Sequence, residues 1–150
     1  MYLNYATANT LLIAEGITDF SDDGDVSIRK AQRALDSRYG RSYMSDIVSV
    51  TQPDLWPRVA FIGRSGKQYD AVVPEEIKLA TAILAYNIQN DISLDVVVSS
   101  VRTEKTKVGE IESHIVYGGG GNTVVPDVWR TIDSIIWPLL TDNNSWRLSL

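Results

Sequence analysis

Side chains able to carry out catalysis are few in this sequence, and none of them forms a recognisable set. The chain has a single histidine, His114, and no cysteine. A catalytic site needs a nucleophile, a base and a group that orients the base, and His114 lies in a segment typical of a β-strand. Glu75 and Glu76 follow Pro74, where acidic side chains favour a helix start. We therefore interpret them as helix-start residues instead of a carboxylate pair, expect no enzyme, and find almost no support for a small hydrolase.

Two further patterns could bind ions or cofactors, and neither matches its motif. The glycine run lacks the lysine of a phosphate-binding loop, so we predict that it is a hinge formed by Gly118, Gly119, Gly120 and Gly121. The aspartates between residues 19 and 25 lack the spacing of a calcium loop, and Asp25 or a neighbour is expected to cap the next helix. The sequence predicts no metal and no cofactor, and the lack of cysteine excludes disulfides and thiolate sites.

Charge is distributed unevenly along the chain. The formal net charge is −5, which argues against broad duplex binding, since that depends on neutralising phosphates with Lys and Arg. Residues 1–25 hold five acids and neither Lys nor Arg, whereas residues 29–41 are mainly basic. Such adjacent segments can pair within one chain, pair head to tail between subunits, or form a solvated helix face.

Two small basic patches are the candidates for binding nucleic acid or an acidic neighbour subunit. They consist of Arg29, Lys30 and Arg33, and of Arg102, Lys105 and Lys107. Neither patch is interleaved with the aromatic side chains on which single-stranded bases stack. Packing against an acidic neighbouring subunit is therefore at least as well supported as contact with nucleic acid.

Helical periodicity dominates the elements that must position these residues. A short helix is predicted over Ala6–Glu15, ended by Gly16, and a second over Val26–Tyr39, with Asp25 and Arg29 able to pair on its surface. Pro74 begins a helix that is apolar on two faces and is expected to be central. The last helix begins near Pro126 and ends near Pro138. Its predicted apolar face contains Val128, Ile132, Ile135, Ile136 and Leu139.

Between and after these helices the sequence predicts three other features. Residues 41–73 carry prolines and glycines that exclude a regular helix, so we expect a long ordered loop pinned by Trp56. A β-hairpin arm at about residues 96–117 is predicted to turn at Gly109. The last eight residues carry large apolar side chains that are typical of anchors: Asn143, Asn144, Ser145, Trp146, Arg147, Leu148, Ser149 and Leu150.

Overall, the sequence predicts one mainly α domain over residues 1–142, with a C-terminal anchoring tail over residues 143–150. The fold class is a small helical bundle with a β-hairpin arm, a long ordered loop and an extended tail. A chain of 150 residues with 44% apolar residues can bury a real core. We expect a soluble protein, because no signal peptide and no apolar run long enough to cross a bilayer are visible.

Several short motifs then occur in an order that resembles one family. They are Tyr5-Ala6, Ala34-Leu35-Asp36, Leu55-Trp56-Pro57-Arg58, Val73-Pro74-Glu75-Glu76, Glu104-Lys105-Thr106-Lys107-Val108-Gly109 and Ile135-Ile136-Trp137-Pro138-Leu139-Leu140. This set resembles the head-to-tail connector, or adaptor, proteins of tailed bacteriophages, sometimes labelled DnaT-like single-stranded-DNA-binding proteins. The resemblance runs from about Tyr5 to Leu140.

The resemblance implies a structural virion protein at the head–tail interface, assembled in the host cytoplasm. About a dozen copies would form a ring that binds the portal protein, extends the DNA channel and offers a docking surface to a downstream neck or tail protein. DNA would pass without sequence-specific binding, and no membrane is involved. The C-terminal residues 143–150 would bind the portal. Both basic patches and Trp56 would contact neighbouring subunits or the phage tail. The alternative is a single-stranded-DNA-binding module.

Overall fold

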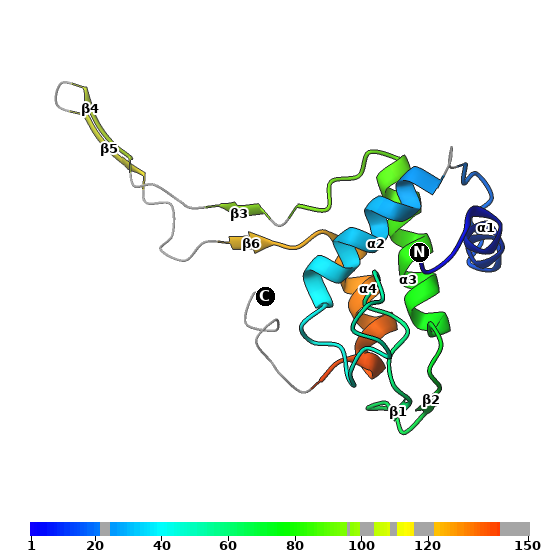
Figure 1. Ribbon diagram of the computed structural model, residues 1–150. Helices are drawn as coiled ribbons and strands as arrows, with labels where there is room; N and C mark the ends of the chain where they lie inside the picture. Colours follow the sequence, from blue (N-terminus) through cyan, green and yellow to red (C-terminus); the bar gives the residue numbers. More distant parts are fainter. Residues whose placement is uncertain (22–24, 96, 100–103, 109–110, 116–121, 142–150) are drawn as a thin grey trace.

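The computed structural model describes residues 1–21, 25–95, 97–99, 104–108, 111–115 and 122–141. Within these ranges four α-helices form the body: α1 (Tyr5–Ala14), α2 (Val26–Tyr39), α3 (Glu75–Gln89) and α4 (Asp127–Ile136), which continues into the short 3-10 helix η2 (Trp137–Leu139). Helix α3 packs against α1, α2 and α4 (Figure 1). This arrangement confirms the predicted mainly α fold and the central position of α3.

The α2 helix has the bounds that its periodicity predicts. Ile28, Ala31, Leu35 and Tyr39 are buried and form its inner face. The predicted ion pair between Asp25 and Arg29 is absent, because Asp25 adopts a left-handed conformation with φ of 58° and accepts a hydrogen bond from Tyr5 N at 2.9 Å. For the same reason its side chain does not cap α2.

The other helices depart from prediction by small shifts. Helix α1 begins one residue earlier than expected, at Tyr5, because Asn4 Oδ1 caps it by accepting from Thr7 N at 3.0 Å. Helix α3 ends at Gln89, and Ile92 beyond its end is 47% exposed. On α4 the prediction missed Trp129, which is buried with Ile132 and Ile136, while Val128 is only half-buried.

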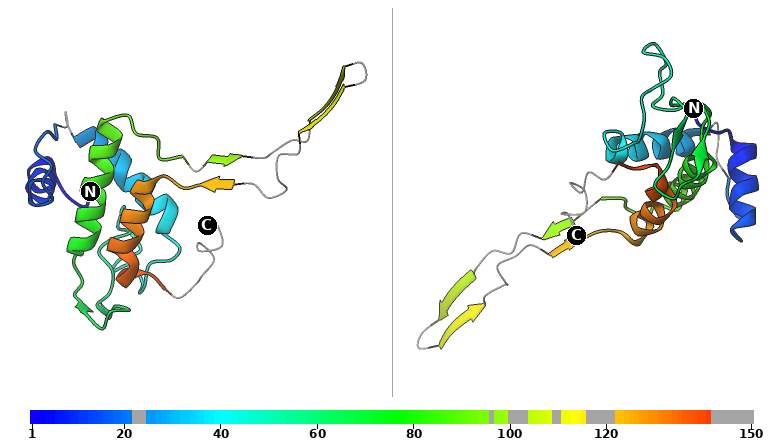
Figure 2. Two further views of the ribbon diagram at one scale, coloured as in Figure 1. Left: turned by 180° about the vertical axis from the view of Figure 1, so that it is seen from behind. Right: turned by 90° about the horizontal axis from the view of Figure 1, so that it is seen from below.

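Residues 41–73 form the predicted ordered loop. It contains a small antiparallel ribbon, β1 (Phe61–Ile62) and β2 (Gln68–Tyr69), and an isolated bridge ties Tyr43 to Leu140 beyond α4. The Trp56 side chain is 2% exposed and packs edge-on against Tyr43, with ring centroids 5.2 Å apart. Seen from below, the segment between α2 and β1 projects from the helical body (Figure 2).

Gly63 packs against Tyr69 and against η2 without room for a side chain. A Cβ atom at this position would lie 2.6 Å from Tyr69 Cε2 and 2.7 Å from the Pro138 carbonyl oxygen. We expect Gly63→Ala to lower the free energy of unfolding by about 1–3 kcal/mol through overpacking, measured by thermal unfolding. Ser65→Ala, in the exposed turn that follows, serves as the control and is expected to change little. Equal stability of both variants would show that the loop can move away from Pro138.

The arm consists of two strand pairs that extend away from the helical body (Figures 1 and 2). Strands β4 (Glu104–Val108) and β5 (Ile111–Ile115) pair antiparallel with Val108 opposite Ile111, as the predicted hairpin requires. The prediction missed a second pair nearer the body, β3 (Val97–Ser99) with β6 (Asn122–Val124). The returning strand therefore extends the arm beyond residue 117, and the predicted hinge at residues 118–121 lies outside the described residues.

The base of the arm is fastened to α4. Trp129 Nε1 donates a hydrogen bond of 2.8 Å to the Leu94 carbonyl oxygen, where the chain leaves the body. The Trp129 ring also lies edge-on to Tyr39, and the Arg38 guanidinium lies 4.8 Å from its centroid. Among the described residues, no helix is long and apolar enough to cross a bilayer.

Candidate functional site

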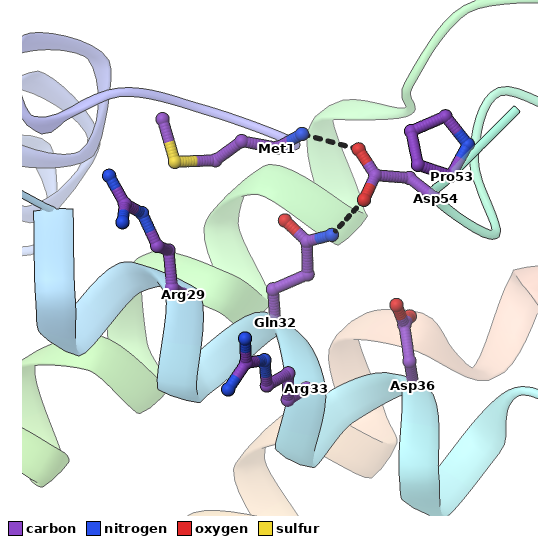
Figure 3. Close-up of a pocket in the computed structure, with 7 residues that line it drawn as sticks. All are labelled: Met1, Arg29, Gln32, Arg33, Asp36, Pro53 and Asp54. Atoms are coloured by element: carbon purple, nitrogen blue, oxygen red, sulfur yellow. Dashed lines mark hydrogen bonds and ion pairs between the residues drawn. The ribbon is translucent and has the colours of Figure 1, made fainter.

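A polar pocket of about 340 Å³ lies where the N-terminal segment crosses α2 (Figure 3). It is lined by Met1, Arg29, Gln32, Arg33, Asp36, Pro53 and Asp54. These residues come from the N-terminus, from two turns of α2 and from the ordered loop. The pocket therefore exists only because three distant segments of the chain meet there.

The acidic groups of the pocket are held by neighbours from the same chain. The Met1 ammonium forms an ion pair with Asp54, whose other carboxylate oxygen accepts from Gln32 Nε2 at 2.7 Å. Gln32 Oε1 in turn accepts from Tyr2 N at 3.0 Å. The Tyr2 hydroxyl lies 2.8 Å from both carboxylate oxygens of Asp36 and donates to that carboxylate. This network fixes the N-terminal segment on α2.

Burial raises the pKa of Asp36 to about 6, although the hydrogen bond from Tyr2 opposes that shift. The pKa of the Tyr2 hydroxyl is raised too, first by burial and then by the charge of Asp36. Asp36 therefore binds its proton more tightly in the folded protein than in the unfolded chain. The free energy of unfolding accordingly falls as pH rises from about 4 to about 6.

Asp36→Asn is expected to remove this pH dependence. The amide oxygen can still accept the Tyr2 hydrogen bond, and no charge is desolvated. Because the carboxylate is partly exposed, solvent screening limits the expected gain at pH 7 to on the order of 1 kcal/mol, with no gain near pH 4. Urea unfolding at both pH values measures this gain in the free energy of unfolding. Asp70→Asn, at an exposed position, is the control. A gain of the same size at both pH values would contradict the prediction.

The predicted basic patch on α2 lies at the rim of this pocket. The side chains of Arg29, Lys30 and Arg33 are all exposed. Figure 3 shows Arg29 and Arg33 on one side of the pocket and the carboxylates of Asp36 and Asp54 on the other. None of the three basic side chains makes a hydrogen bond or an ion pair with another residue in the described part of the chain. The site can therefore accept an anionic group from outside.

Comparison with known proteins places the chain in a family. A family model described as "Putative DnaT-like ssDNA binding protein" matches residues 1–150. The chain belongs to this DnaT-like family. No curated protein and no solved structure matches it. The match confirms the DnaT-like label in the resemblance and agrees with the single-stranded-DNA-binding alternative; the phage connector part stays a prediction.

Three other predicted site residues of this DnaT-like protein, Trp56, Lys105 and Lys107, do not line the pocket. Trp56 is a core residue that pins the loop and is only 2% exposed, so little of its side chain is available for the predicted contact. Lys105 pairs in register with His114 and Lys107 with Glu112 in the outer part of the arm. Arg102 and the portal-binding residues 143–150 lie outside the described residues.

The residues considered for catalysis are also separated. Glu75 pairs with Lys78 at 2.7 Å, whereas Glu76 pairs with Lys67 at 2.6 Å and accepts from the Tyr69 hydroxyl. The two glutamates thus bind different partners and do not act as a pair. No group of three potential ligands that could hold a metal ion is present in the ranges that the structure describes.

Sequence reasoning missed several residues that build the site in this family member. Tyr2, Gln32 and Asp54 form its network. Arg58 supports the ordered loop and contacts both Tyr43 and Trp56, with its guanidinium 5.3 Å and 5.5 Å from the two ring centroids. Arg58 also donates to the Leu55 carbonyl oxygen at 3.1 Å. No local spacing signals these contacts, because their partners come from separate segments.

Proposed function

We propose that this protein is a structural adaptor that forms a ring on the portal of a tailed bacteriophage and offers a docking surface to the neck or tail. The observation that carries this proposal is the two-stranded arm, which extends beyond the helical body (Figure 1). A two-stranded ribbon alone is marginally stable in water. An arm of this kind gains its stability by packing on another molecule, which favours an assembly protein.

Two further observations support an adaptor. The ordered motifs from Tyr5 to Leu140 resemble the head-to-tail connectors. The net charge of −5 suits a channel wall along which DNA must slide without adhering. In this proposal, residues 143–150 bind the portal, the arm and the α2 basic residues contact neighbouring copies, and a downstream neck or tail protein docks on the ring.

The test is to mix the purified chain with its cognate portal ring and to image the product by electron microscopy. Full-length protein is expected to add a coaxial ring, and protein truncated after Asp142 is expected to add none. If both proteins add a ring, the adaptor function is supported, but residues 143–150 are not the segment that binds the portal. If neither protein adds a ring, the proposal is wrong.

The second candidate function is single-stranded-DNA binding, favoured by the description of the matched family. Exposed and unpaired Arg29, Lys30 and Arg33 would then contact phosphates. The affinity for a labelled oligo(dT) would fall steeply with salt, and each lost phosphate contact would reduce the logarithmic slope by about 0.7. An adaptor should hardly bind the oligonucleotide, so a salt series with and without Arg29→Ala/Arg33→Ala distinguishes the two functions.

A further inference from the structure

The outer face of α2 carries a basic stripe, which we define as Arg29, Lys30 and Arg33. These residues lie at three- and four-residue spacing on the side opposite buried Ile28 and Leu35. Ser37 continues the exposed side by one more turn. The stripe therefore presents three positive charges on one rigid element.

The nearest acids do not neutralise the basic stripe. Asp54 is held by the Met1 ammonium and by Gln32, and Asp36 is held by Tyr2. Figure 3 shows that the guanidinium groups of Arg29 and Arg33 lie on the other side of the pocket from these carboxylates. The two arginines, one helical turn apart, remain able to donate to a carboxylate that enters from outside.

The same chain carries two exposed acids just before α2 in the sequence, Glu15 and Asp19, which we call the acidic segment. Glu15 and Asp19 are exposed, and no Lys or Arg side chain pairs with either of them among the described residues. Asp19 instead accepts a long bond of 3.4 Å from the Tyr86 hydroxyl, and Asp25 accepts from a backbone amide. Five acids and no basic residue occur between residues 15 and 25.

We propose that the basic stripe binds the acidic segment of a second copy of this chain, in a head-to-tail contact that rests on the proposed ring. Such a contact joins two different surfaces, so it can repeat from copy to copy and close a ring. Isolated surface ion pairs contribute little, but the three basic residues of the stripe facing Glu15 and Asp19 form a network. A nucleic-acid strand fits this face less well, because the acidic segment precedes α2 directly and would repel phosphates.

Crosslinking between single-cysteine variants tests this contact while keeping every charge. The chain contains no cysteine, so only the introduced thiols react. Thr18→Cys reports on the acidic segment, Ser37→Cys on the end of the basic stripe, and Ala71→Cys is an exposed control position in the ordered loop. With a short bismaleimide, Thr18→Cys mixed with Ser37→Cys is expected to give several-fold more dimer than Thr18→Cys mixed with Ala71→Cys.

Charge reversal makes the test specific. Arg29→Glu/Arg33→Glu in every chain, or high salt, is expected to abolish the excess crosslinking. Adding Glu15→Lys/Asp19→Lys to the same chains is expected to restore it. No excess over the control pair, or an excess that ignores charge reversal, would overturn the inference. So would a reversal that weakens oligo(dT) binding without changing the crosslinks.

This test and the portal experiment fail separately. A ring on the portal without the charge-dependent crosslink would keep the adaptor function and place the subunit contact on another surface. A charge-dependent crosslink without a ring on the portal would keep the self-association and reject the adaptor function.

Discussion

Replacing Trp56 by alanine is expected to lower the free energy of unfolding by about 3–5 kcal/mol. The indole is 2% exposed, belongs to the hydrophobic core and packs against Tyr43 and Phe61 of the same loop. The Arg58 guanidinium lies 5.5 Å from its ring centroid. Removing the ring would leave a large cavity and take away one of the two aromatic partners of a buried arginine. Urea unfolding followed by circular dichroism measures the loss.

Val50 provides the matched control for this substitution. It lies in the same loop but is 91% exposed, so Val50→Ala should change stability by no more than about 0.5 kcal/mol. A Trp56→Ala protein as stable as the Val50→Ala protein would mean that the loop is not held by its tryptophan. Another contact would then have to hold residues 41–73 in their ordered conformation.

Removing the arm is expected to abolish ring formation on the portal while leaving the helical body folded. Val97 and Val124 are paired across the base of the arm, so a short Gly-Ser linker can replace residues 96–124 without strain. The core residues that the structure describes, from Tyr2 to Ala85 and from Val125 to Leu140, are all kept in this variant. Shortening a loop changes closure entropy only logarithmically, so we expect the free energy of unfolding to change by about 1 kcal/mol or less.

The arm deletion is read by electron microscopy with the portal, and unfolding of the same protein serves as its control. A shortened protein that is folded but forms no ring is the expected outcome. A folded protein that still forms a complete ring would show that the arm does not make the essential contact. The adaptor proposal would then lose the observation on which it is founded.

The helices could be predicted from the sequence because their signals are local. The apolar spacing of α2 gives its bounds, and Gly16, with φ of 84°, ends α1 as expected. The β3–β6 pair escaped prediction because its strands are short and are separated by the whole outer hairpin. Trp129 was missed because periodicity alone could not decide between it and Val128 for the inner face of α4.

The candidate site was only partly predictable for the same physical reason. Arg29, Lys30 and Arg33 are close in sequence, so their common exposed face follows from helical geometry. The pocket beside them depends on Tyr2 reaching Asp36, 34 residues away, and on Gln32 reaching Asp54. Contacts between distant segments leave no periodic pattern in the sequence. Only the folded chain therefore reveals that Asp36 and Asp54 already have hydrogen-bond partners.

The hydrogen bond between Trp129 and Leu94 couples the base of the arm mechanically to the helical body. The indole hydrogen bond holds the point where the chain leaves the body, and the same ring touches Tyr39 and Arg38 of α2. A partner that binds the base of the arm at β3 or β6 is therefore expected to exert force on α4 and on the helix that carries Arg29 and Arg33. We expect binding of one neighbour at the base of the arm to set the angle at which α2 meets the next, so that each subunit added to an assembly orients its successor.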